Sequence, residues 1–169
     1  IPLNQLPCLP KNRLTRLLLP HLPHLLIGQE GRPHLFLCLE DYNRFHLEEL
    51  HSVIRGIKHM LADDGVFVIQ FMYAGAMVEN NNFDTIYHEH LCYYTLKNVI
   101  SLLSPYELEV FDAYYSDIHS GSIIAKICHS YSPLDEKTER FTELLRKDEK
   151  YTPDAFVSFA NLVHLSRSD

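Results

Sequence analysis

The stretch Met60–Phe71, MLADDGVFVIQF, decides the fold. Its second half, Val66–Phe71, is a nearly continuous apolar run, which is typical of a strand buried on both faces of a parallel sheet. Asp63, Asp64 and Gly65 precede the run, and glycine readily adopts the positive φ that ends a helix. A helix, a short glycine turn and a buried strand form half of an α/β unit. The stretch therefore predicts an α/β fold.

A helix is expected immediately before this stretch. The chain carries apolar residues at three- and four-residue steps, which marks one face of a helix: Leu47, Leu50, Ile54, Ile57 and Leu61. Acidic residues begin this segment and basic residues end it, an arrangement that suits the helix dipole.

The segments after the buried strand are expected to alternate between loops and periodic elements. Residues 74–94 are polar and without clear periodicity, so they are interpreted as a loop beyond the carboxyl end of the strand, where functional loops lie in open α/β sheets. Thr95 is a suitable cap for a helix that reaches Leu103. The remaining expected elements are an antiparallel hairpin of Leu108–Tyr115 and Ser122–Cys128, and two amphipathic helices over 134–147 and 153–165.

The first 39 residues differ in composition from the rest of the chain. They hold six of the nine prolines and thirteen leucines, but no Ala, Val or Asp. Four basic residues and one acid give this segment a net charge of +3. Because the whole chain has a net charge of −7, the remaining 130 residues carry −10. Three interpretations are open: a secretory signal, a disordered leader, or a translated segment that is not native coding sequence. The composition favours the last, and residues 1–45 are left unassigned.

Composition and charge also restrict the class of protein. The chain has no run of the roughly 20 apolar residues that a membrane span requires, so no membrane partner is expected. The acidic balance argues against nucleic-acid binding through phosphate contacts. The four cysteines form no CxxC pair, so no structural zinc site is expected and free thiols in the cytoplasm are the default prediction.

The densest cluster of chemically active side chains is Asp84–His90, DTIYHEH. Histidine changes charge near neutral pH, and a neighbouring glutamate can orient or polarise it. Three interpretations compete: a metal site, polar loop residues that satisfy one another, and general acid/base catalysis in a cleft. The position beyond the predicted strand favours the third.

The run Asn82–Leu91, NFDTIYHEHL, followed by Tyr93 and Tyr94, resembles the signature of the sugar C-methyltransferases. These are class I enzymes that use S-adenosylmethionine (SAM) to methylate carbon 3 of nucleotide-linked 4-keto-deoxysugars. Met60–Ile69 is similar to the approach to their fifth strand, and residues 108–112 and 119–122 are similar to their sixth strand and the start of their seventh. The resemblance extends from about His46 to Asn161. It implies a partial class I methyltransferase (Rossmann-like) sheet, strands five to seven, followed by helices.

The resemblance also implies roles for individual residues. His90 matches the base that removes the C3 proton, with Tyr87 and Glu89 positioning the substrate or the imidazole. His46 matches a histidine that reaches the same cleft from before the first helix. His88, His119 and Ser122 are the expected substrate contacts. The resemblance assigns no cofactor-binding residue and no metal ligand in this chain.

The chain departs from the family at both ends. The family has a glycine-rich SAM loop and a cysteine-rich zinc module upstream, and none of the six glycines here forms such a loop. We therefore expect residues 46–130 to be the C-terminal half of a SAM-dependent methyltransferase domain, 131–169 to begin the family's C-terminal domain, and the chain to be inactive alone. Self-association through an uncovered sheet edge is a further expectation. The alternatives are a non-catalytic α/β interaction module and a His/Glu metal hydrolase.

Overall fold

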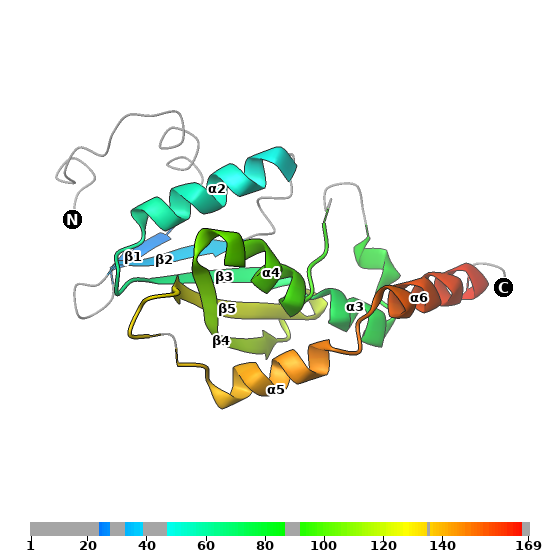
Figure 1. The fold of residues 1–169 in the computed structure, drawn as a ribbon. Coiled ribbons are helices and arrows are strands. Elements are labelled where there is room, and N and C mark those ends of the chain that lie inside the picture. The colour runs from blue at the N-terminus through cyan, green and yellow to red at the C-terminus, as the bar shows by residue number, and fades with distance from the viewer. Residues whose placement is uncertain (1–23, 28–32, 39–46, 87–91, 135, 167–169) are drawn as a thin grey trace.

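Five strands form one mixed sheet in the order β1-β2-β3-β5-β4 (Figure 1). The computed structural model describes residues 24–27, 33–38, 47–86, 92–134 and 136–166. The strands are β1 (His24–Ile27), β2 (Pro33–Cys38), β3 (Val66–Met72), β4 (Leu108–Ser116) and β5 (Ser122–His129). The predicted α/β fold, with a partial Rossmann-like sheet, is confirmed.

The β3 strand is the centre of the sheet and of the core. Phe67 and Ile69 are 2% exposed and Phe71 is 1% exposed, as the apolar run predicts. Its neighbours differ in direction, because β2 pairs with β3 in parallel whereas β5 pairs with it antiparallel. The sheet around β3 is therefore mixed rather than wholly parallel. The β4–β5 hairpin is antiparallel, as predicted, and places β5 between β3 and β4.

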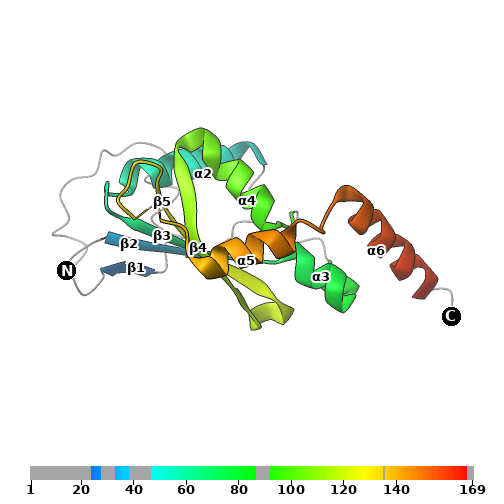
Figure 2. The same cartoon turned by 60° about the horizontal axis from the view of Figure 1, so that its bottom comes forward.

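The helices that border the sheet follow the predicted periodicity. The α2 helix (Leu47–Met60) buries Val53, Ile54 and Ile57, and α4 (Leu96–Leu103) buries Leu96, Val99 and Leu103. Figure 2 shows α2 and α4 on the same side of the sheet. Burial of these apolar stripes stabilises both helices more than their intrinsic propensity does. The α5 helix (Glu139–Asp148) packs against β4, and α6 (Pro153–Ser166) lies beside α3 (Ala74–Asn80) and extends away from the sheet (Figure 2).

Two local predictions are wrong. Residues 74–80, expected in a loop, form α3, whose first four residues Ala74–Met77 are buried. Small side chains allow this short helix to pack closely, but they leave no periodic pattern for sequence reasoning to detect. The helix expected from 134 begins instead at Glu139, because the Thr138 side chain accepts a hydrogen bond from the Phe141 amide and caps it.

The Leu/Pro-rich segment, for which the sequence predicts no element, contributes β1 and β2. Proline has no amide hydrogen for a sheet ladder, and Pro33 occupies the first residue of β2, where such a residue is tolerated. The strand conformation of β2 therefore depends on its pairing with β3, which the composition of the segment does not indicate. Whether residues 1–45 are native coding sequence, and where the domain boundaries at 45 and 130 lie, remain predictions.

Candidate functional site

All four predicted catalytic residues and one predicted substrate contact, His88, lie outside the described residues. These are Tyr87, His88, Glu89 and His90 of the YHEH run, together with His46. The described part of the site consists of the residues just before and just after the YHEH run, together with the turn between β4 and β5. His119 lies in that turn, within η5 (Ile118–Ser120), although its side chain is outside what the structure describes.

The segments on the two sides of the YHEH run are held by different contacts. On one side, η3 (Phe83–Thr85) ends with the Ile86 amide donating to the Phe83 carbonyl at 3.1 Å. On the other side, Tyr94 forms a parallel bridge with Tyr73, and the Ala74 amide donates to the Tyr94 carbonyl at 3.0 Å. Tyr94, four residues after the run, therefore lies beside the strand end, where ligands bind in open α/β sheets.

The β4–β5 turn reaches the same end of β3. The Tyr73 amide donates to the Gly121 carbonyl at 3.0 Å, and the Asn82 side-chain amide donates to the Ser120 carbonyl at 3.5 Å. Gly121 has a φ of 125°, and a Cβ at this position would lie 2.4 Å from the Ala76 Cβ. Only glycine fits this close approach between the turn and α3.

Ser122, an expected substrate contact, is fully buried, and its hydroxyl donates to the Ile118 carbonyl at 2.9 Å. This bond closes the turn that carries His119. The structure thus gives Ser122 a structural partner, while the substrate-binding roles of Ser122 and His119 remain predictions.

Tyr94, four residues after the run, packs against β3. Its ring lies edge-on to Phe71 with centroids 6.3 Å apart. Burial, followed by the neighbouring Cys92 thiol, raises the pKa of Tyr94 to about 12. Tyr94 is therefore neutral near pH 7, which suits a packing aromatic rather than a base.

Sequence reasoning missed a buried carboxylate that is bonded to Tyr73. Asp148, the last residue of α5, is 1% exposed and accepts three hydrogen bonds. Its donors are the Tyr73 hydroxyl at 2.8 Å and the amides of Leu96 at 3.2 Å and Lys97 at 2.9 Å. Burial, followed by the hydrogen bond to Asp148, raises the pKa of Tyr73 well above its ordinary value. No local pattern distinguishes Asp148 from the exposed charges of α5, so sequence alone could not have found it.

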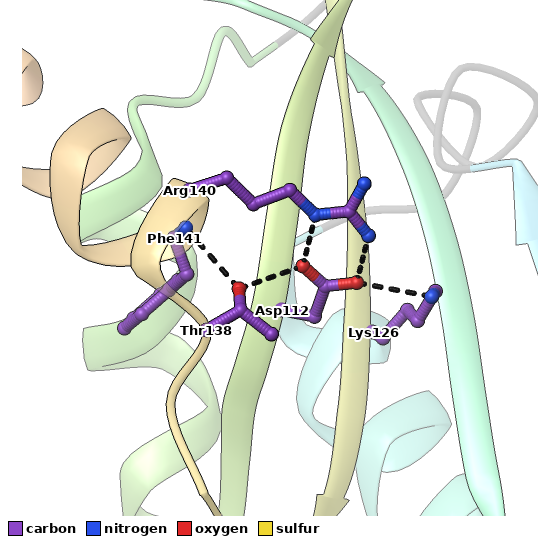
Figure 3. Close-up of polar contacts among 5 residues, drawn as sticks. All are labelled: Asp112, Lys126, Thr138, Arg140 and Phe141. Atoms are coloured by element: carbon purple, nitrogen blue, oxygen red, sulfur yellow. Dashed lines mark hydrogen bonds and ion pairs between the residues drawn. The ribbon is translucent and has the colours of Figure 1, made fainter.

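A second buried carboxylate lies between β4, β5 and α5 (Figure 3). Asp112 accepts hydrogen bonds from Thr138 Oγ1 at 2.8 Å and from Arg140 Nε at 2.6 Å and Nη2. Lys126 Nζ lies 3.0 Å from Asp112 Oδ2. Burial alone would raise the pKa of Asp112, but Arg140, Lys126 and Thr138 together hold it well below its usual range. This network attaches α5 to the sheet.

The glycines in the described segments do not form a loop that would cradle SAM. Of the six glycines, the four in described segments serve other purposes: Gly56 lies within α2, Gly65 in the turn before β3, Gly75 within α3 and Gly121 in the β4–β5 turn. Within the described ranges, no three His, Cys, Asp or Glu side chains gather as metal ligands. The helices that the structure describes include none long and apolar enough to cross a membrane.

The strand order β3-β5-β4 and the polar segment at the end of β3 define a mixed α/β fragment compatible with part of a Rossmann-like domain. A scan against models of protein families finds no match. A comparison with curated proteins finds the C-methyltransferase NovU of Streptomyces niveus, which is 38% identical over 79 residues. The match covers 47% of this chain and 19% of NovU, so the chain spans a small part of that relative. Over these 79 residues the chain is similar to part of a C-methyltransferase.

Proposed function

We propose that this chain is the substrate-side part of a SAM-dependent C-methyltransferase that acts at carbon 3 of a nucleotide-linked 4-keto sugar. The observation that carries the proposal is the 38% identity to a C-methyltransferase over 79 residues. The pairing of Tyr94, four residues after the YHEH run, with Tyr73 at the end of β3 supports it, because that is where α/β enzymes bind their ligands. We place the reaction in the cytoplasm, the compartment that free thiols favour.

In this proposal His90 is the general base. The C4 ketone makes the C3 proton acidic, because the enolate that forms places its negative charge on the ketone oxygen. An imidazole titrates near neutral pH, so neutral His90 accepts this proton at physiological pH. Tyr87 and Glu89 orient the imidazole or the sugar, His46 is the further catalytic histidine, and His88 and His119 contact the substrate. When bound, SAM supplies the methyl group.

We expect the chain alone to bind SAM very weakly and to be inactive. The reason is that none of the glycines in described segments forms a loop able to approach the cofactor closely. Calorimetric titration of the chain with SAM checks this expectation. A micromolar dissociation constant would contradict it.

The catalytic proposal is tested by restoring a SAM-binding part. Residues 46–169 replace the matching part of NovU, and methyl transfer from labelled SAM to a nucleotide-linked 4-keto-deoxysugar is measured. His90→Ala should abolish transfer, while His59→Ala, an exposed histidine on α2, should leave it unchanged. A folded, SAM-binding chimera that methylates no such sugar would refute the proposed function. Full activity of His90→Ala would remove His90 from the role of base.

The distribution of glycines favours a second candidate, a non-catalytic α/β module that binds partner proteins or a second copy through its sheet edge. Sedimentation velocity of the chain separates the two. A concentration-dependent dimer combined with an inactive chimera would favour the module, whereas a monomer with an active chimera would exclude it.

A further inference from the structure

Two segments beside the end of β3 expose large apolar side chains. Phe83, the first residue of η3, is 41% exposed, and Ile86, which follows η3, is 50% exposed. Tyr115, near the end of β4, is 44% exposed, and Ile118, the first residue of η5, is 47% exposed. Single exposed apolar side chains are common on protein surfaces, whereas a group of them marks an interaction surface.

The two segments are in contact, so their exposed side chains share one surface. Asn82, the residue before η3, donates its side-chain amide to the Ser120 carbonyl at 3.5 Å. The Gly121 amide donates to the Ile118 carbonyl at 3.1 Å, and a Cβ on Gly121 would lie 2.8 Å from the Tyr115 hydroxyl. We call the four exposed side chains the η3–η5 patch: Phe83, Ile86, Tyr115 and Ile118.

The fixed charges of the two segments are all acidic. Residues 82–86 and 115–121 contain no lysine and no arginine. Asp84 lies within η3 and Asp117 directly precedes η5, and both are exposed. An apolar surface bordered by carboxylates is complementary to apolar side chains that are flanked by basic ones.

The same charges argue against other occupants of the η3–η5 patch. Asp84 and Asp117 repel the phosphates of a nucleic acid and the headgroups of an anionic membrane. A second copy docked patch to patch would bring the four carboxylates of the two copies together, and like charges across an interface are costly. A basic protein segment meets neither obstacle.

We propose that the η3–η5 patch is a docking surface for a partner protein segment that carries lysine or arginine beside large apolar side chains. This role goes beyond the proposed methyl transfer and does not rest on it. It also differs from binding through the sheet edge, because side chains rather than unpaired backbone groups make the contacts. Four half-exposed side chains form a small surface, so the complex should be weak and transient.

The test measures the fluorescence anisotropy of a labelled synthetic peptide of leucine and lysine in the presence of the whole 169-residue chain. This peptide should bind, and its counterpart with glutamate in place of each lysine should not. Ile86→Ser and Ile118→Ser, one from each segment, should each weaken binding roughly three- to tenfold, because each loses about half of a buried isoleucine's contribution. Asp84→Asn combined with Asp117→Asn should weaken binding roughly two- to tenfold and reduce its dependence on salt.

The α6 helix supplies matched controls. Val157 is 60% exposed and Asp154 is exposed in the first turn, so Val157→Ser and Asp154→Asn remove similar groups from another element. Both should leave peptide binding unchanged. Asp154→Asn also separates docking from the general attraction of a basic peptide to an acidic chain. Circular dichroism establishes that each variant is folded, and the two exposed aspartates still decide the question if a serine variant fails to fold.

The proposal is overturned if the leucine–lysine peptide does not bind, or if the α6 variants weaken its binding as much as the patch variants do. Binding of the chain to phosphatidylserine vesicles that is lost in Ile118→Ser would assign the patch to a membrane instead. A dimer in sedimentation velocity that Ile118→Ser dissociates would assign it to a second copy. These measurements need neither SAM nor methyl transfer, so their failure is distinguishable from failure of the chimera assay.

Discussion

The Asp112 network is the contact whose removal should cost this fold most clearly. The Asp112 side chain is 3% exposed, whereas those of Arg140 and Lys126 are 50% and 38% exposed. Asp112→Asn keeps the shape of the side chain but removes its charge. It also leaves one amide oxygen where two carboxylate oxygens accepted from Thr138, Arg140 and Lys126.

The magnitude follows from the burial of the three charged groups. Charge-assisted hydrogen bonds contribute about 1.5–3 kcal/mol each, and breaking a fully buried pair costs roughly 3–5 kcal/mol. Arg140 and Lys126 are partly exposed, so water can hydrate them after the substitution. The loss of stability should therefore be smaller than the roughly 3–5 kcal/mol of a fully buried pair. We expect Asp112→Asn to lower the free energy of unfolding by about 2 kcal/mol.

Urea denaturation followed by circular dichroism measures this loss. The matched control is Glu143→Gln, since Glu143 pairs with Lys147 at 3.0 Å on the exposed face of α5. An exposed pair of this kind contributes little, so the control should leave the urea midpoint unchanged. The reasoning is refuted if the two amide substitutions shift the midpoint equally, or if Asp112→Asn has no effect.

Three further predictions follow from the same contacts. The partners of Asp112 depress its pKa in the folded state, so the unfolded chain binds more protons at low pH. The free energy of unfolding should therefore fall as the pH drops below about 4, and it should fall less steeply in Asp112→Asn. Urea titrations at several pH values measure both slopes. Gly75→Ala should destabilise the chain by roughly 1–3 kcal/mol, because a Cβ there would lie 2.5 Å from ring atoms of both Tyr73 and Tyr151; a raised melting temperature would contradict this. Thr95→Ala should cost about 1 kcal/mol through loss of the α4 cap, and an unchanged urea midpoint would show that the cap contributes nothing.

Sequence patterns predicted the elements whose signals are local. The α2 stripe, the apolar β3 run, the Thr95 cap and the β4–β5 hairpin each lie within a short window of residues, and each is present. The α3 helix was missed because it is only seven residues long and its buried residues Ala74–Met77 are consecutive, so they form no helical repeat. The β1 and β2 strands were missed because a proline-rich segment gives no strand signal until β3 pairs with it.

The candidate site divides in the same way. The YHEH run and its resemblance to sugar C-methyltransferases were legible from sequence, because reactive residues at close spacing form a recognisable motif. The surroundings of the segment that follows it were not, since Tyr73 at the end of β3 contacts Tyr94, Gly121 of the β4–β5 turn and Asp148 of α5, which lie far apart in the sequence.

By itself, the sequence determined an α/β fold around Val66–Phe71 and a histidine-rich segment after it, because periodicity and motif are properties of neighbouring residues. Only the tertiary structure decided that β5 separates β3 from β4, and that Asp112 and Asp148 are buried carboxylates. The physical reason is that a charged side chain is buried only where several donors converge on it. For Asp148 those donors lie at least 51 residues away along the chain.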